Sequence, residues 1–151
     1  MSVYYDILKR VQHDIRSLSL TCVAPTNVVI QKVATDRKRT LPALPGVLVS
    51  PFGAKVAPAT AGTNRRDDIE YPVLVVTLAA SNDSQTSDLE RETDWHERII
   101  STFIHQRLTG VSSVINCRID PRDVFNPTAF FDKQLDAGGI ILRFVSRETR
   151  G

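Results

Sequence analysis

Residues 71–80, Tyr-Pro-Val-Leu-Val-Val-Thr-Leu-Ala-Ala, carry the strongest β-strand pattern in the chain and decide its fold class. Pro72 lies at the start of the run, where the N–H that proline lacks is tolerated. Alternate side chains of a strand point to opposite faces. Both faces are apolar here, with Val73, Val75 and Ala79 on one and Leu74, Val76 and Leu78 on the other. We therefore predict a central strand whose second face is covered by another layer of the subunit or by a neighbouring subunit.

The residues on either side of this strand predict the remaining elements. Apolar residues at helical spacing predict helices over residues 3–18 and 88–109. Further strands are predicted over residues 27–33, 47–49, 113–119 and 140–147. This order predicts an α+β fold: a single-layer mixed, largely antiparallel sheet of about four or five strands with two main helices packed on it.

The second predicted helix has clear end signals. Ser87-Asp88-Leu89-Glu90 fits a capping box, in which the serine and glutamate side chains each bond a backbone N–H at the helix start. One apolar stripe follows, made of Trp95, Ile99, Phe103, Ile104 and Leu108. Gly110 is predicted to end the helix in the left-handed conformation.

Length and composition predict one soluble domain over residues 1–151. The chain is 42% hydrophobic and 24% charged, and its apolar runs fall short of the ~18 residues of a membrane span. The first residues lack the pattern of a secretory signal, so we expect a protein made in the cytoplasm. Cys22 and Cys117 form neither a disulfide framework nor a zinc pattern, and both are predicted to be small buried thiols.

The net charge of +2 conceals a segregation of charge along the chain. Residues 35–66 carry six basic side chains and one acid, whereas residues 67–97 carry nine acids and one arginine. Most of the basic side chains lie in a proline-rich segment, 34–69, that is predicted to be a long loop or arm. Opposite charges on one small domain suit head-to-tail self-association, although two separately solvated surfaces would give the same pattern.

The self-association hypothesis names a set of candidate interface residues. The arm would extend onto a neighbouring subunit or ring and contact its acidic residues. The candidates are Arg37, Lys38, Arg39, Arg65, Arg66, Asp67, Asp68, Glu90 and Asp94.

Catalytic motifs are incomplete in this sequence. His96-Glu97 begins a zinc-protease pattern, but position 100 is Ile100, so His96 and His105 are interpreted as solvated helix histidines. Gly138-Gly139 lacks the residues of a phosphate-binding loop and is interpreted as a turn or bulge before the last strand. No catalytic residue, cofactor or metal ligand is predicted.

Two less favoured functions remain open. Asp120-Pro121-Arg122-Asp123, together with Asp67-Asp68, contains the acids of a magnesium-dependent nuclease but lacks the accompanying acid-x-Lys pattern. A DNA-binding accessory protein would use Arg37, Lys38 and Arg39 on phosphates, although the aromatic stacking partners of a single-strand binder are missing nearby.

Several phrases of the sequence resemble one family. They are Leu44-Pro45-Gly46-Val47-Leu48-Val49-Ser50-Pro51-Phe52-Gly53, the run from Gly62 to Val73, Trp95-His96-Glu97-Arg98-Ile99, and the run from Leu142 to Glu148. In their order these phrases resemble the tail-terminator or neck proteins, which join head and tail in long-tailed bacteriophages.

This resemblance implies a structural virion protein without enzymatic activity. It implies a homo-oligomeric ring, commonly of six subunits, that caps the tail tube and binds the adjacent head-connector or stopper and tail-tube proteins. Genomic DNA would pass through the lumen without sequence specificity. The protein would be assembled in the host cytoplasm and located in the virion neck. A head–tail adaptor or stopper of the same neck is the alternative.

Overall fold

The computed structural model describes residues 2–32, 44–52, 57–60, 66–80, 86–121 and 135–149. Within these residues, two helices, a short 3-10 turn and six strands follow one another. They are α1 (Val3–Ser17), η1 (Pro25–Asn27), β1 (Val28–Ile30), β2 (Gly46–Pro51), β3 (Ala57–Thr60), β4 (Arg66–Ala80), α2 (Thr86–Phe103), β5 (Val114–Pro121) and β6 (Leu135–Thr149).

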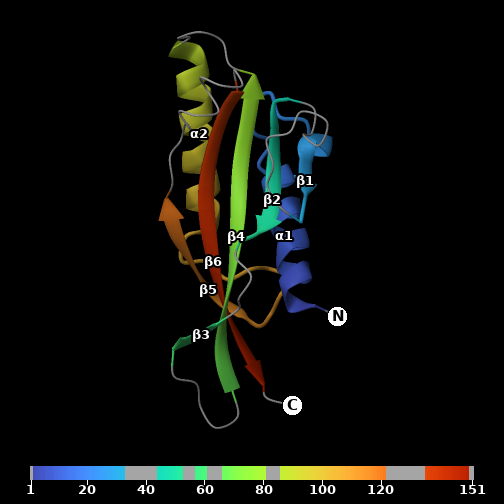
Figure 1. The fold of residues 1–151 in the computed structure, drawn as a ribbon, viewed down its shortest axis with the longest axis vertical. Coiled ribbons are helices and arrows are strands. Elements are labelled where there is room, and N and C mark those ends of the chain that lie inside the picture. Colours follow the sequence, from blue (N-terminus) through green and yellow to red (C-terminus); the bar gives the residue numbers. More distant parts are fainter. Residues whose placement is uncertain are drawn as a thin grey trace.

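The strands form one mixed sheet in the order β1-β2-β4-β6-β5, and β3 pairs with β4 beside this path. Only the β1–β2 pair is parallel among the pairs of the described strands; the others are antiparallel. Figure 1 shows the long β4 and β6 side by side at the centre of the sheet. The predicted α+β fold, a largely antiparallel mixed sheet with two helices, is confirmed.

Both helices pack on one face of the sheet. Four residues on one face of β4 belong to a core cluster shared with α1 and α2: Tyr71, Val73, Val75 and Ala79. The opposite face holds a smaller cluster, in which the fully buried Leu48 and Leu78 contact Val29, Val76 and Ala137. The central strand predicted from its two apolar faces is therefore present, and it is longer than the predicted 71–80.

Helix α1 forms because its start is capped and one of its faces is apolar. The Ser2 side chain accepts the Tyr5 N–H at 3.2 Å, which satisfies a donor that has no partner within the helix. Its buried residues are Ile7, Leu8, Val11 and Ile15. Their spacing of three to four residues places them on the stripe that meets the sheet.

Helix α2 ends earlier than predicted. It begins at Thr86 and ends at Phe103, so the predicted helix over 104–109 is wrong. His105 adopts the left-handed conformation (φ 55°), and its N–H bonds the carbonyl of Cys117 at 2.9 Å. The His105 N–H therefore bonds β5 instead of a carbonyl one turn earlier in the helix. Gly110 does have positive φ (87°), but in a later turn rather than at the helix end.

Two further sequence interpretations are corrected by the strands. Gly138 and Gly139 lie inside β6, paired with Thr77 and Val76, and not in a turn or bulge before the strand. Segment 34–69 is not one long loop or arm, because β2 within it pairs with both β1 and β4. Its Val47, Leu48 and Val49 are fully buried, so this part of the segment belongs to the core.

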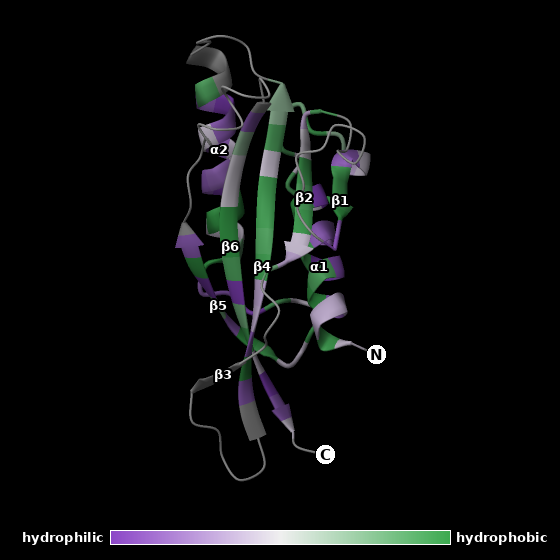
Figure 2. Cartoon of the chain, in the orientation of Figure 1, coloured by the Kyte–Doolittle hydropathy of each residue, from purple (hydrophilic) through white to green (hydrophobic). Residues whose placement is uncertain are grey.

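One end of the sheet projects beyond the helices (Figure 1). We call it the ribbon: β3, residues 66–70 of β4 and residues 145–149 of β6, in which β4 pairs with β6 in continuous register and with β3 across an irregularity between Pro58 and Thr60. Strands of 15 residues such as β4 and β6 are about 50 Å long. Figure 2 shows apolar residues in the middle of these two strands and hydrophilic ones toward the ribbon. The ribbon is therefore more polar than the middle of the sheet, although Ile69 packs against the core and Val145 and Ser146 are buried.

Candidate assembly interface

The structure describes only part of the predicted interface set. Arg37, Lys38, Arg39 and Arg65 lie outside the described residues. Arg66 and Asp67 lie at the start of β4 in the ribbon, where their backbones pair with Thr149 and Glu148. Asp68 lies beside them, whereas Glu90 and Asp94 are exposed on α2. The described candidates therefore fall on two separate elements, the ribbon and α2.

Asp68 pairs with an arginine of its own subunit. The Arg147 guanidinium on β6 donates to both carboxylate oxygens, Nε to Oδ1 at 2.8 Å and Nη2 to Oδ2 at 3.0 Å. The two residues face each other in register across β4 and β6. This bidentate pair raises the pKa of Arg147 and holds the two strands of the ribbon together.

A second set of charges crosses three strands next to this pair. Arg143 on β6 donates to Asp120 on β5 through Nε, and to Glu70 on β4 through Nη1 at 3.2 Å. Arg118 on β5 lies 3.6 Å from the other oxygen of Glu70. The pKa of Arg143 is raised, first by the hydrogen bond to Asp120. Burial lowers this pKa, and the hydrogen bond to Glu70 raises it further. We call these four residues the charge ladder.

The charge ladder bears on the nuclease alternative. Asp120 is one of the acids of that hypothesis, and here its carboxylate is paired with the Arg143 guanidinium. Among the described residues, no group of three His, Cys, Asp or Glu side chains is placed to hold a metal ion. The observed role of Asp120 is to join β5 to β6.

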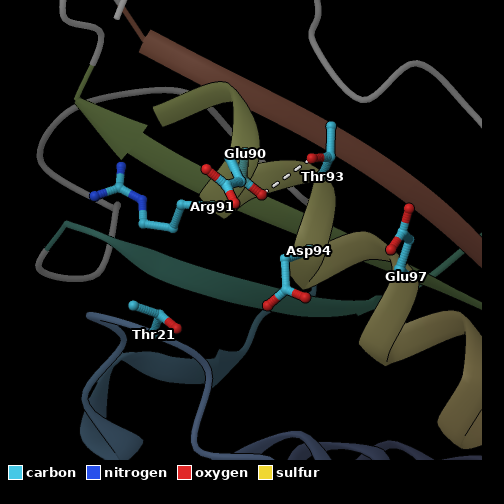
Figure 3. Close-up of a pocket in the computed structure, with 6 residues that line it drawn as sticks. All are labelled: Thr21, Glu90, Arg91, Thr93, Asp94 and Glu97. Carbon is cyan, nitrogen blue, oxygen red and sulfur yellow. Dashed lines mark hydrogen bonds between the residues drawn. The ribbon is translucent and has the colours of Figure 1, made fainter. Parts of the chain in front are cut away.

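The exposed side of α2 carries a shallow acidic pocket of about 470 Å³ (Figure 3). Its lining residues are Thr21, Glu90, Arg91, Thr93, Asp94 and Glu97. The lining holds three carboxylates and one guanidinium, so the surface is net negative and suits a basic partner. The predicted candidates Glu90 and Asp94 lie together here, and sequence reasoning did not single out Glu97 or Thr21 for this surface.

Two buried contacts fix the loop that forms the other wall of the pocket. The Trp95 indole N–H donates to the Thr21 carbonyl at 3.0 Å, and the Arg98 guanidinium donates to the Leu18 carbonyl. Arg91 stacks over the Trp95 ring, 5.0 Å from its centroid. The acidic side chains therefore project from a rigid part of the molecule.

Both sheet edges are partly closed within the subunit. On β5, the Cys117 carbonyl accepts the His105 N–H, and the strand ends on Pro121, which has no N–H to donate. On β1, the Val28 carbonyl accepts hydrogen bonds from Gln12 at 2.9 Å and Arg16 at 3.0 Å. Such blocking disfavours the addition of a foreign strand along these edges.

His96 is not the solvated helix histidine that the sequence predicted. It is 4% exposed, and its Nε2 lies 2.9 Å from the Thr77 hydroxyl on β4. Burial lowers its pKa. The helical stripe places His96 next to Trp95 at the sheet, so it faces the core. His105 is exposed, as predicted.

The two cysteines differ. Cys117 is a buried thiol, as predicted, and burial raises its pKa to about 12. Cys22 is exposed, so the prediction of a buried thiol is wrong there. Cys22 lies in a turn after the end of α1 and has a positive φ (66°).

Comparison with known proteins gives a likeness of fold to solved structures. No family model matches the chain, and no curated protein matches it. A chain from the structure titled "Virion of native gene transfer agent (GTA) particle" is similar, with 14% sequence identity and a TM-score of 0.47. The match covers 97% of this chain and 94% of that one. A likeness of this degree transfers no function.

None of the described helices is both long and apolar enough to cross a membrane.

Proposed function

We propose that the chain is a structural subunit of the neck of a long-tailed phage particle. In this proposal it forms a ring, commonly of six subunits, that terminates the tail tube and joins it to the head connector. Genomic DNA passes through the lumen. The observation that carries the proposal is the ribbon, which projects from a core whose own sheet edges are partly closed. The family resemblance of the sequence supports the same conclusion.

The ribbon suits a role between subunits. A short strand assembly without a hydrophobic layer is marginally stable in water by itself. Here the Asp68–Arg147 pair and the charge ladder add charged contacts that hold the strands of the ribbon together. In an isolated domain such a projection contributes little to the apolar core, whereas in a ring it can lie against the next subunit.

The acidic pocket supplies a complementary surface on another side of the molecule. We propose that Glu90, Asp94 and Glu97 of one subunit receive the basic residues of segment 37–39 from the next. Because the two surfaces differ, the contact is heterologous and repeats around an axis until the ring closes. Contacts between exposed charges weaken as salt rises, so ring closure should be sensitive to ionic strength.

Native mass spectrometry of the purified chain at low and moderate salt tests the proposal, with negative-stain images of the same sample. The expected result is a closed oligomer with a central hole that loosens with salt. Charge reversal at Glu90→Lys with Asp94→Lys should abolish the ring, and Arg37→Glu with Arg39→Glu should do the same. Mixing the two reversed variants should restore hetero-oligomers.

A matched control separates the proposed contact from a general effect of charge. Asp6→Asn removes one carboxylate from α1 and Asp94→Asn removes one from α2, and only the second should weaken the ring. A chain that stays monomeric at low salt and cuts DNA only with magnesium present would contradict the proposal. That result would favour the nuclease alternative instead.

The adaptor or stopper of the same neck remains the alternative position. A terminator binds the end of a purified tail tube, whereas an adaptor or stopper binds the head connector. Co-sedimentation of the ring with each of these two particles decides between them. Binding to the tube alone is the expected result.

A further inference from the structure

The partners of β4 change at Pro72, where the ribbon meets the core of the sheet. β6 pairs with β4 along its whole length. On the other side of β4, β2 reaches only as far as Val73, and β3 begins opposite Glu70. On this side of β4, Tyr71 and Pro72 therefore fall between the residues that pair with β2 and those that pair with β3. The Pro72 nitrogen cannot donate there, and the Pro72 carbonyl accepts the N–H of Phe52, the residue that follows β2.

The hydroxyl of Tyr4 on α1 lies at this junction. It donates to the Pro72 carbonyl and accepts the Phe52 N–H at 3.2 Å. The same Phe52 N–H also bonds the Pro72 carbonyl at 3.1 Å. These three groups form a closed set of hydrogen bonds at the point where β2 leaves the sheet. The Tyr4 hydroxyl thus reinforces the backbone hydrogen bond that joins the end of β2 to β4.

The ring of Tyr4 extends this contact toward the end of β6. It packs edge-on against Tyr71, with ring centroids 5.1 Å apart and an interplanar angle of 61°. The Tyr71 hydroxyl donates to the Glu148 carboxylate at 2.6 Å. A continuous set of contacts therefore runs from the first helix through β4 to the ribbon part of β6.

We propose that Tyr4 is a positioning residue that holds the ribbon in one direction relative to the core. Two-stranded ribbons twist more than wide sheets, and Pro72 lies where the described partner of β4 changes from β2 to β3. The Tyr4 hydroxyl ties this place to α1, which is itself buried against the core. Without it, the ribbon keeps its own pairs but its junction opens more often.

Hydrogen exchange on the full chain tests the proposal with Tyr4→Phe, which removes only the hydroxyl and keeps the ring on Tyr71. Amides of residues 66–70 and 145–149 should exchange roughly fivefold faster, the factor that one ordinary hydrogen bond contributes. Amides of residues 73–78 should be unchanged. Tyr5→Phe is the matched control, because the adjacent Tyr5 is 53% exposed and touches Lys9 instead.

Two results would overturn the inference. One is exchange in Tyr4→Phe that equals the wild-type rate in the ribbon. The other is faster exchange spread equally over residues 73–78, which would make the hydroxyl a contributor to global stability only. Glu148→Ala acts from the far end of the same contacts, and it should accelerate exchange in the ribbon alone.

A second measurement rests on the proposed ring function. If the ribbon contacts the next subunit, Tyr4→Phe should raise the protein concentration needed for ring closure, and Tyr5→Phe should not. The exchange experiment is read on the monomer at high salt. A chain that never forms rings would therefore contradict the proposed function and leave the exchange result to decide the role of Tyr4.

Discussion

The imidazole of His96 on α2 lies 2.9 Å from the hydroxyl of Thr77 on the central strand β4. Both residues are buried, at 4% and 3% exposure, and they join the second helix to the middle of the sheet. Burial lowers the pKa of His96 because the charged imidazolium would lose its hydration there. Because the pKa of His96 is lowered in the native protein, the free energy of unfolding depends on pH.

The free energy of unfolding should fall in mild acid because of His96. The unfolded chain takes up a proton on this residue near its ordinary pKa of 6.5, whereas the native protein does so only at lower pH. Stability is therefore complete above that pKa and is lost as the pH falls through it, by at most about 1.4 kcal/mol per pH unit. Urea unfolding between about pH 5.5 and 8 measures this slope.

Two histidine variants provide the control. His96→Gln should flatten the pH dependence, and His105→Gln, at an exposed position, should leave it as in the wild type. An equal slope in wild type and His96→Gln would show that other groups cause the acid sensitivity.

The two thiols should differ sharply in reactivity. Cys22 is exposed, whereas Cys117 is buried with its pKa raised to about 12, so its thiolate is scarce and shielded. Titration with a disulfide reagent at pH 8 should modify Cys22 in the native protein and Cys117 only in denaturant. The Cys22→Ser variant should be unreactive until it is unfolded; prompt reaction of this variant would place Cys117 at the surface.

Trp95 should be the most sensitive residue of α2. Its ring is fully buried, and its indole N–H donates a hydrogen bond to the Thr21 carbonyl. Trp95→Ala should lower the free energy of unfolding by about 3–5 kcal/mol. Trp95→Phe, which mainly loses the hydrogen bond, should lower it by about 1–2 kcal/mol. Leu89→Ala on the same helix is half exposed and should cost less than about 0.5 kcal/mol by urea unfolding.

Arg143 should couple the three strands of the charge ladder. Arg143→Met leaves Glu70 and Asp120 without their shared cation and should lower the free energy of unfolding by about 1 kcal/mol at low salt. The loss should shrink as salt screens the carboxylates. A double-mutant cycle with Asp120→Asn measures the pair directly, and a coupling of zero would mean that the contact contributes nothing. Arg107→Met, at an exposed position, is the matched control.

Local sequence patterns were sufficient for most elements of the fold. The two-faced apolar run at Val73–Ala79 indicated a central strand, and helical stripes located α1 and most of α2. These features depend on the period of apolar residues, which is a local property of the chain. The short strand at 47–49 was also recognisable, although its place between β1 and β4 was not.

The tertiary structure decided which polar residues meet. Asp68 and Arg147 are 79 positions apart, and no pattern in either segment shows that they face each other in register. The burial of His96 follows from the position of α2 on the sheet, and the contact of Tyr4 with Pro72 from that of α1.

The sequence by itself therefore determined the elements, the apolar core and the segregation of charge. The early end of α2, the ribbon, the charge ladder and the junction at Tyr4 were decided by tertiary structure. The physical reason is that apolar periodicity is repeated within each element. A hydrogen bond or an ion pair, by contrast, depends on the register and angle between elements, which are set only when the whole sheet is assembled.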